Sequence, residues 1–254
     1  MTKKPGIFFL PHLGLGDHIL CNGMQRYLYS KYQKMVMPVK SNNLDAIKRM
    51  FEDMKNLYII PLEGSLDYND DYHLQASVGM ANLYSSMGYD IVSMGSFLND
   101  SISLEKTRDG KYQTYDELFY SQAGVPFEEK WHSFYLPRDH NREKKLFNMF
   151  DGIKEGEYVF LHDDPHRGRK INRDLFKKNI PVISPSKKFW DADIFDYGYL
   201  IENACEIHCV NSAFADFIDF LDLSKVERKC IHAYARPEFP VRYKNNFEVI
   251  KNDK

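Results

Sequence analysis

Residues 7–20, IFFLPHLGLGDHIL, contain the change of pattern that decides the fold. Four apolar residues have the length and composition of a short buried strand. A proline and a turn with two glycines follow, and apolar side chains such as Leu20 and Met24 then return at helical spacing. We therefore predict a strand at Gly6–Leu10, a tight turn, and a helix over Asp17–Tyr32.

The first half of the chain repeats this alternation of strand and helix. Further apolar runs have strand length, and the segments between them have amphipathic helical spacing. The predicted strands are Met35–Val39, Leu57–Ile60 and Asp90–Met94, and the predicted helices are Asn43–Met54 and Ala76–Met87. Strands that alternate with helices form right-handed βαβ units, so this half predicts a parallel sheet.

The middle of the chain interrupts the alternation. A helix is predicted over Tyr115–Ala123, and Gly124-Val125-Pro126 ends it. We expect a strand at Trp131–Leu136 and a charged amphipathic helix at Asn141–Phe150. This segment separates the first series of strands from a second one.

The second series repeats the pattern of the first. Its predicted strands are Glu157–Leu161, Ile180–Ser184, Glu206–Val210 and Lys229–His232, and its predicted helices are Asp193–Ala204 and Ala213–Leu221. Two such series predict two α/β domains with Rossmann-like βαβ units, residues 1–138 and residues 139–254. A single sheet of about seven or eight strands is the alternative architecture.

The composition is that of a globular protein with a sizeable core. The chain has 254 residues, of which 43% are hydrophobic and 28% are charged, and its formal net charge is −2. A nearly neutral chain has no basic field for nucleic acid or an anionic membrane, so neither is expected as a partner. No run of about 18 apolar residues is present, so no membrane span is predicted.

The cysteines indicate a reducing compartment. Cys21, Cys205, Cys209 and Cys230 form no C-x-x-C pair and show no zinc-type spacing. We expect reduced, mostly buried thiols in a cytoplasmic protein.

The turn Gly14-Leu15-Gly16-Asp17 admits three interpretations. As a dinucleotide fingerprint it is incomplete, because Ile19 stands where the third glycine belongs. As a purely structural turn, it would use its aspartate as the helix N-cap. As a catalytic turn, its glycines would let a substrate approach the backbone while the aspartate does the chemistry, assisted by His12 or His18.

The segment FLHDDPHRGRKI, residues 160–171, places a dense polar loop directly after a predicted strand. Its cations lie next to a glycine and suit an anionic group such as a pyrophosphate. A solvated charged loop is the alternative that needs no ligand. The cations are Arg167, Arg169 and Lys170, and a metal site would instead use His162, Asp163, Asp164 and His166.

The segment EIHCVNSAFADFIDFL, residues 206–221, contains a strand that gives way to a helix. The predicted helix start at Asn211, Ser212 and Ala213 would offer free N–H groups and a partial positive charge, which suit a phosphate. Ordinary capping by Asn or Ser is the alternative.

Two further carboxylate motifs have weaker patterns. Glu202 could accept hydrogen bonds from a ribose, or it could be a surface glutamate. Asp191-x-Asp193 matches the D-x-D pattern that holds a divalent metal in metal-dependent sugar transferases. Because it precedes a predicted helix, we favour a capping role for Asp193.

Taken in order, three of these motifs resemble heptosyltransferase-like glycosyltransferases of the GT-B fold. GLGDHILCNGMQRYL is similar to the first βα turn of that family, and YVFLHDDPHRGRKI to the start of its second Rossmann-like domain. IHCVNSAFADFI resembles the later turn that binds the donor's phosphates. The second motif is also distantly similar to the His-x-Arg motif of inverting fucosyltransferases.

The resemblance implies a fold and a reaction. The fold has two Rossmann-like domains with a ligand cleft between them, the acceptor domain being residues 1–138 and the nucleotide-sugar domain residues 139–254. The reaction is an inverting, metal-independent transfer of a hexose or deoxyhexose from a nucleotide-sugar to a hydroxyl of a glycan or other acceptor. No cofactor is expected, because the nucleotide-sugar is a co-substrate.

The same resemblance implies the roles of the site residues. Asp17 would be the general base, with His18 beside it as a second catalytic group. Arg167, Arg169 and Lys170 would neutralise the leaving nucleoside diphosphate in place of a metal. The remaining donor contacts would be Gly14, Gly16, His162, Glu202, Asn211, Ser212 and Ala213.

Two other classes of function remain open at this point. An NAD-dependent oxidoreductase or epimerase would use the glycine turn for a dinucleotide, although the third glycine is missing. A non-catalytic nucleotide- or sugar-binding module would bind the donor without turning it over.

Overall fold

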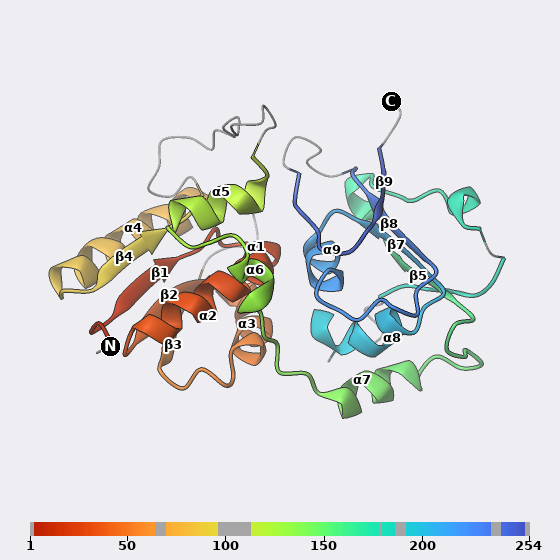
Figure 1. Cartoon of the computed structure of the whole chain (residues 1–254), viewed down its shortest axis with the longest axis horizontal. Coiled ribbons are helices and arrows are strands. Elements are labelled where there is room, and N and C mark those ends of the chain that lie inside the picture. The colour runs from red at the N-terminus through yellow and green to blue at the C-terminus, as the bar shows by residue number, and fades with distance from the viewer. Residues whose placement is uncertain are drawn as a thin grey trace. The chain divides into compact units, whose positions relative to one another are not determined.

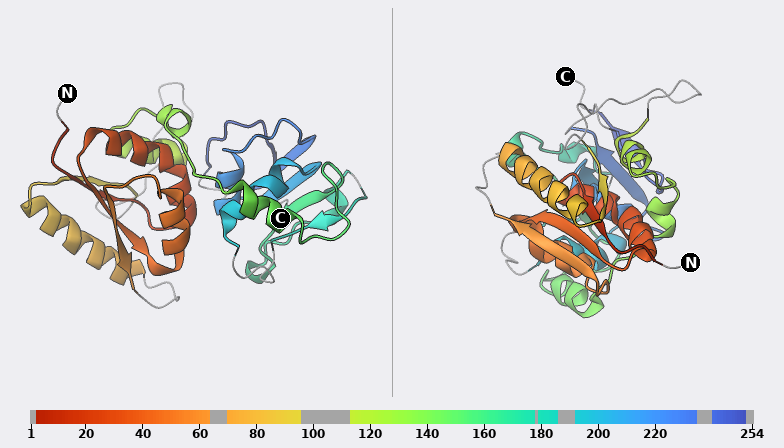
Figure 2. Two further views of the ribbon diagram at one scale, coloured as in Figure 1. Left: turned by 90° about the horizontal axis from the view of Figure 1, so that it is seen from below. Right: turned by 90° about the vertical axis from the view of Figure 1, so that its left-hand side faces the viewer.

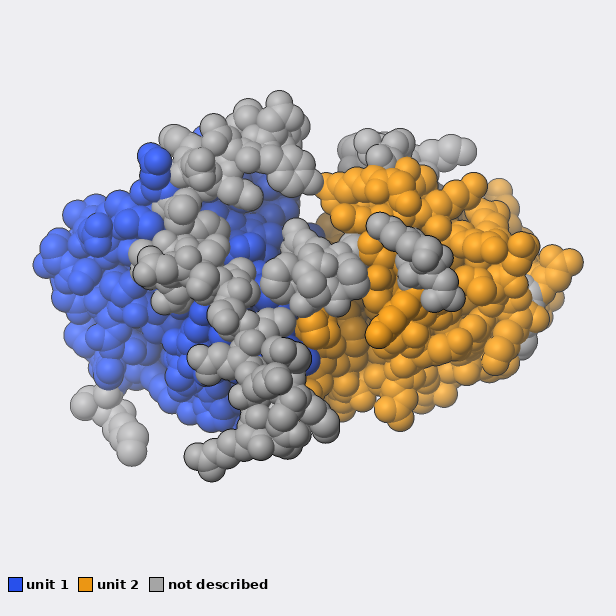
Figure 3. All heavy atoms as spheres, turned by 90° about the horizontal axis from the view of Figure 1, so that it is seen from above, with its two compact units in different colours: residues 1–137 blue, residues 138–254 orange. Residues whose placement is uncertain are grey.

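The computed structural model of the chain describes residues 3–63, 70–95, 113–177, 179–185, 192–234 and 240–251. The chain divides into two compact units, Met1–Pro137 and Arg138–Lys254, which Figure 3 colours separately. The sequence places the boundary one residue further on, between residues 138 and 139. Each unit has its own parallel sheet (Figure 1), so the alternative of one large sheet is wrong.

The first unit is built on a four-stranded parallel sheet in the order β3-β2-β1-β4. Its strands are β1 (Ile7–Leu10), β2 (Met35–Lys40), β3 (Leu57–Leu62) and β4 (Asp90–Ser93). In the centre, Ile7 of β1 pairs with Met35 on one side and with Asp90 on the other. All four residues of β1 are buried, as expected for an apolar strand covered on both faces.

Helices cover both faces of this sheet (Figure 2). They are α1 (Leu15–Leu20), α2 (Asn22–Lys31), α3 (Leu44–Met50) and α4 (Asp70–Ser86). On one face, Ala81 of α4 packs in a cluster with Phe8 and Leu10 of β1. On the other face, Gln25 of α2 contacts Met37 of β2.

The predicted helix Asp17–Tyr32 is observed as two helices. Cys21 adopts φ −89° and ψ 0°, which ends α1 and lets α2 begin at the next residue. The periodicity of the apolar residues continues across this break, so the sequence pattern does not reveal it.

The expected strand at Trp131–Leu136 is wrong. After α5 (Tyr115–Gln122), the chain forms the short helix α6 (Glu129–His132) and then an irregular segment. The N–H and C=O of Tyr135, which a strand would pair with another strand, are bonded instead to the side chain of Asn22, at 3.0 and 3.1 Å. Because a side chain satisfies these groups, the segment needs no partner strand. Leu136 is buried, whereas Tyr135 is 54% exposed.

The second unit is built on a five-stranded parallel sheet in the order β6-β5-β7-β8-β9. Its strands are β5 (Val159–His162), β6 (Val182–Ile183), β7 (Glu206–Val210), β8 (Arg228–His232) and β9 (Glu248–Ile250). The edge strand β9 was not predicted from the sequence. It is short and mostly exposed, so it lacks the apolar run that revealed the other strands.

The helices of this unit are α7 (His140–Phe147), α8 (Gly198–Glu202) and α9 (Ala213–Ile218). The predicted helix Asp193–Ala204 begins as a tighter turn at Ile194–Tyr197 and continues as α8. The carboxylate of Asp193 accepts the N–H of Phe195 at 2.7 Å, which confirms its predicted capping role. Asp191, the other half of the D-x-D motif, lies outside the described residues.

Within the part of the chain that the structure describes, no helix is long and apolar enough to span a membrane.

Candidate functional site

The first candidate site lies where the connections of the first sheet change direction. After β1 the chain crosses to β2 on one side, whereas β4 lies on the other side of β1. The loops that leave β1 and β4 therefore diverge at their carboxyl ends, which is where open parallel sheets bind ligands. The loop after β1 carries His12 and Gly14, and the loop after β4 carries Gly95.

The side chain of Asp17 points back toward the loop after β1. Its Oδ2 accepts the backbone N–H of Gly14 at 3.1 Å and lies 3.0 Å from Nδ1 of His12. Gly14, and not Asp17, occupies the N-cap position of α1. Asp17 is therefore not the N-cap residue: it is the third residue of α1, and its carboxylate reaches back to the N-cap N–H as in a capping box.

Gly14 is required by the position of this carboxylate. A Cβ atom at Gly14 would lie 2.6 Å from Oδ2 of Asp17, which is too close for two non-bonded atoms. The backbone of Gly14 has ordinary extended angles, φ −76° and ψ 151°. The glycine therefore makes room for the carboxylate. Gly16 lies within α1 and is half-buried.

An aromatic wall closes one side of His12. The hydroxyl of Tyr115 lies 3.4 Å from His12 Nδ1, and the ring centroids of Phe119 and His12 are 6.1 Å apart. Gly95 lies against His12 as well: its φ is +73°, and a Cβ there would lie 2.6 Å from Cδ2 of His12. His12 was predicted from the sequence as a residue that could assist Asp17. Gly95, Tyr115 and Phe119 were not, because they come from distant parts of the chain and belong to no motif.

His18 is fully buried in α1, and its Nδ1 lies 3.4 Å from Nε2 of Gln25. Burial lowers the pKa of His18 to about 4, although the charge of Asp17 acts in the opposite direction. A neutral imidazole with no exposed surface cannot touch a substrate. The structure therefore places His18 in the core of the first unit, and it brings His12 to the carboxylate instead.

The second candidate site lies at the corresponding place in the second sheet. The connections reverse between β5 and β7, because β6 lies on one side of β5 and β7 on the other. His162 ends β5, and Ser212 follows β7. Nδ1 of His162 lies 3.3 Å from Oγ of Ser212, so two motifs 50 residues apart in the sequence meet here.

His162 is held between an aromatic ring and a thiol. Its imidazole stacks on Phe214 with 4.3 Å between ring centroids, and Sγ of Cys209 lies 3.7 Å from Nδ1. Burial lowers the pKa of His162 to about 4, against the opposing charges of Asp163 and Asp164. The side chain is therefore a neutral hydrogen-bonding group at neutral pH.

Ser212 occupies the N-cap position of α9, yet its hydroxyl makes no capping hydrogen bond. It faces His162 instead. The ordinary capping interpretation therefore does not account for this serine. Asn211, Ser212 and Ala213 are all half-buried at the carboxyl edge of the sheet.

The basic loop after β5 is an ordered turn. The backbones of Asp164 and Arg169 exchange hydrogen bonds of 3.0 and 2.9 Å, and Gly168 between them has φ +71°. The carboxylate of Asp164 lies 3.5 Å from Arg167 and 3.8 Å from Arg169. The Arg167 side chain is nevertheless 59% exposed, and Lys170 is exposed as well, so cationic groups of the loop remain in contact with solvent.

The metal interpretations find no support among the residues that the structure describes. Within them, no three His, Cys, Asp or Glu side chains gather in a way that could hold a metal ion. The side chain of His166 and all of Asp191 lie outside the described set.

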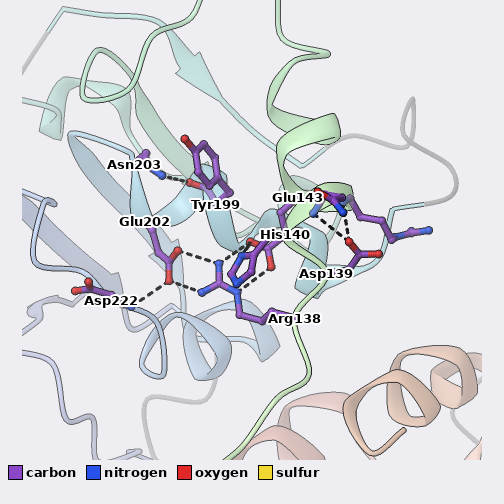
Figure 4. A network of polar contacts seen from close by, with 10 residues as sticks. Arg138, Asp139, His140, Glu143, Tyr199, Glu202, Asn203 and Asp222 are labelled. Atoms are coloured by element: carbon purple, nitrogen blue, oxygen red, sulfur yellow. Dashed lines mark hydrogen bonds and ion pairs between the residues drawn. The ribbon is translucent and has the colours of Figure 1, made fainter.

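Glu202 lies at the amino ends of the strands of the second sheet, opposite to the carboxyl ends where His162 and Ser212 stand. It ends α8, four residues before β7 begins, whereas Ser212 comes after β7 ends. Both of its carboxylate oxygens contact Arg138, one of them at 2.8 Å, and Arg138 also binds Glu143 (Figure 4). Glu202 lines a hollow of about 400 Å³ that is separate from the His162–Ser212 pair. The structure therefore does not bring Glu202 to the other predicted donor contacts.

Comparison with known proteins identifies the fold. No family model matches the chain, and no curated protein matches it either. Among solved structures, the E. coli ADP-heptose LPS heptosyltransferase II is similar over 96% of this chain and 90% of its own, with a TM-score of 0.57 and 13% sequence identity. The E. coli heptosyltransferase WaaC with ADP is similar over 97% of this chain and 90% of its own, with a TM-score of 0.43 and 11% identity. The first of these comparisons confirms the predicted fold class, two Rossmann-like domains of the GT-B heptosyltransferase type.

Proposed function

We propose that this protein is a glycosyltransferase that moves a sugar from a nucleotide-sugar donor to an acceptor hydroxyl, with inversion at the anomeric carbon and without a metal. One observation supports the proposal: in a chain with a heptosyltransferase fold, the Asp17 carboxylate is held at the strand-order reversal of the first sheet, the kind of place where open parallel sheets generally bind ligands. A dedicated glycine, Gly14, makes room for it there.

The first unit supplies the basic group. An acceptor hydroxyl is a poor nucleophile until its proton is removed, and a positioned base typically contributes about 10²–10⁴-fold to such a step. Asp17 provides the negative charge that makes this removal favourable. His18 has no exposed surface, so the proposal gives it no catalytic role.

The second unit supplies groups for the donor's phosphates. The loop cations Arg167, Arg169 and Lys170 would offset the negative charge of the leaving nucleoside diphosphate, as a metal ion does in other transferases. Asn211, Ser212 and Ala213 stand at the carboxyl edge beside His162 and would hold the donor through hydrogen bonds. Neutral groups and cations together suit a diphosphate better than a free sugar.

The identity of the nucleotide-sugar donor has to be determined by experiment. The structural relative is named for ADP-heptose, so ADP-heptose belongs in the first screen. UDP-, GDP-, CMP- and dTDP-activated hexoses and deoxyhexoses belong beside it, because the family resemblance implied that class of sugar and the sequence does not identify the donor. NAD completes the panel as the probe for an oxidoreductase.

The test has a binding arm and a transfer arm. A nucleotide at 100 times its dissociation constant should add about 2.7 kcal/mol to the free energy of unfolding, with or without EDTA. The wild-type protein should then transfer the sugar, and Asp17→Asn should bind the donor without transferring it. Stabilisation by NAD alone would contradict the proposal, and donor binding without turnover on any acceptor would indicate a binding module instead.

A further inference from the structure

We propose that the proton of the acceptor is taken by Nε2 of His12, and that Asp17 acts through this histidine by orienting it and balancing its charge. This inference rests on the proposed function and assigns the proton transfer to a particular atom. It makes His12 the catalytic residue and Asp17 the positioning residue.

The contacts of Asp17 define the protonation of His12. A carboxylate can only accept hydrogen bonds, so the nitrogen 3.0 Å from Oδ2 of Asp17 must carry a proton. That nitrogen is Nδ1, and in a neutral imidazole the other nitrogen, Nε2, then carries no proton and has the lone pair of a base. The hydroxyl of Tyr115 lies 3.4 Å from the same nitrogen, and its oxygen can accept from a protonated Nδ1.

The exposure of the two side chains favours histidine as the group that meets the acceptor. The Asp17 side chain is 11% exposed and the His12 side chain is 28% exposed. In addition, Oδ2 of Asp17 already accepts both the N–H of Gly14 and the contact from His12. One oxygen of the carboxylate is therefore engaged in holding the loop, and the imidazole is the more exposed of the two side chains.

The fold provides a fixed place for the imidazole. His12 leaves the end of β1, which is the strand beside the point where the connections reverse. Gly95 has positive φ and no Cβ, so the loop after β4 can lie against the ring. The ring of Phe119 covers it from α5. A base held on three sides keeps its orientation when a substrate arrives.

The proposed step is balanced. The acceptor O–H bond breaks and its proton goes to Nε2 of His12, while the acceptor oxygen forms a bond to the anomeric carbon of the donor. The bond from that carbon to the diphosphate oxygen breaks, and its electron pair leaves with the nucleoside diphosphate. The imidazolium is stabilised by Asp17 and afterwards releases its proton to water.

The experiment compares variants that keep or remove the base. His12→Asn retains an amide N–H that can donate to Asp17, but it has no atom in place of Nε2. We expect it to lower kcat by about 10²–10⁴-fold without weakening donor binding. Asp17→Asn should cause a loss of similar size, because its amide would reverse the tautomer of His12. The double variant should lose little more than either single one, as expected for residues that act as a unit.

His132→Asn is the matched control, because His132 is an exposed histidine at the end of α6 in the same unit. It should retain wild-type kcat. All variants are checked for folding by circular dichroism. A second measurement needs no substrate: ¹⁵N NMR of labelled histidine should show the proton of His12 on Nδ1, with His12→Asn identifying the signal.

Two results would overturn the inference. One is a kcat of His12→Asn within about twofold of wild type, the scatter expected of an unrelated site. The other is a proton on Nε2 of His12 in the wild-type NMR spectrum. Either would leave the proposed function intact, with Asp17 as the direct base. The absence of transfer by the wild-type protein, in contrast, would refute the proposed function itself.

Discussion

At the scale of single residues, the candidate site depends on where small side chains leave room. Gly14 is needed because the Asp17 carboxylate occupies the space that a Cβ would fill, and Gly95 because His12 does the same. Each glycine therefore makes room for one member of the Asp17–His12 pair. Substitution of Gly14 should change activity more than stability, because its backbone is in an extended conformation that any residue adopts.

Gly14→Ala should reduce transfer strongly while the protein stays folded. The added methyl group displaces Oδ2 of Asp17, so the contact with His12 is lost. We expect kcat to fall by about 10²-fold or more, as for loss of the base, with a change of only about 1 kcal/mol in unfolding free energy. Kinetics and urea unfolding check this.

The double variant Gly14→Ala/Asp17→Ala is the control for this prediction. Once the carboxylate is gone, the methyl group has nothing to displace, so the alanine at position 14 should cause no further loss. Two losses that multiply would show that the methyl group acts by another route.

His18→Leu should make the protein less sensitive to acid. The pKa of His18 is about 4 in the folded protein and about 6.5 when unfolded, so the unfolded state binds more protons between these values. The stability that this histidine provides is complete above pH 6.5 and is lost as the pH falls toward 4. Between pH 7 and pH 5 this loss amounts to about 2 kcal/mol, and His18→Leu should abolish it.

Urea unfolding at both pH values measures the difference, and His132→Leu serves as the exposed control. Leucine has no polar atom to bury, and within the described residues Nε2 of His18 has no hydrogen-bond partner. Stability at pH 7 should therefore change little. An unchanged acid sensitivity in His18→Leu would contradict the burial argument.

At the scale of elements, α5 and α6 hold the aromatic wall in place. Lys130 of α6 donates to Asp116 of α5 at 2.7 Å, and both side chains are fully buried. Gly23 lets α2 approach α6 closely, because a Cβ there would lie 2.0 Å from the carbonyl oxygen of Glu129. Tyr115 precedes Asp116, so this packing also fixes the residue that contacts His12.

Lys130→Met should destabilise the protein by about 3–5 kcal/mol, because it leaves the Asp116 carboxylate buried without its cation. Adding Asp116→Leu should recover most of that loss, since an apolar pair of similar volume does not have to be desolvated. Urea unfolding of the two single variants and the double variant measures this coupling. Additive losses would show that the ion pair is not the reason for the loss.

The elements also show where sequence patterns mislead. The strand expected at Trp131–Leu136 has apolar residues but no partner strand, because the Asn22 side chain bonds the backbone of Tyr135. The sequence pattern does not reveal the helix break at Cys21, because the apolar spacing continues across it. It does not reveal the edge strand β9 either, because this short and mostly exposed strand has no apolar run. These differences come from contacts that local periodicity does not encode.

At the scale of the whole molecule, two sheets with different strand orders present their candidate residues at equivalent places. The first has the order β3-β2-β1-β4 and the second β6-β5-β7-β8-β9, and each reverses beside its first strand. The first unit holds a carboxylate and an imidazole there, whereas the second holds neutral hydrogen-bonding groups and a basic loop. We therefore expect the two units to respond differently to a nucleotide.

Addition of the stabilising nucleoside diphosphate should slow hydrogen exchange in residues 162–170 and 211–213. These loops lie at the carboxyl edge of the second sheet and would hold the phosphates. Residues 12–17 of the first unit should be little affected by the nucleotide alone. Exchange measured by mass spectrometry tests this, with NAD as the control ligand. Protection confined to residues 12–17 would move nucleotide binding to the first unit.

The sequence by itself determined the βαβ alternation, the presence of two series and the turn that carries Asp17. Strand and helix patterns depend on the spacing of neighbouring side chains, and turns depend on glycine and proline, so both are local properties. Only the tertiary structure decided which histidine meets Asp17. His12 stands five residues before Asp17 and His18 one residue after it, yet His18 is buried in α1 beside Gln25 of α2, whereas His12 is partly exposed. The tertiary structure also brings His162 to Ser212 and Glu202 to Arg138. The burial of a side chain and its contact partners depend on how strands distant in the sequence are ordered in the sheet.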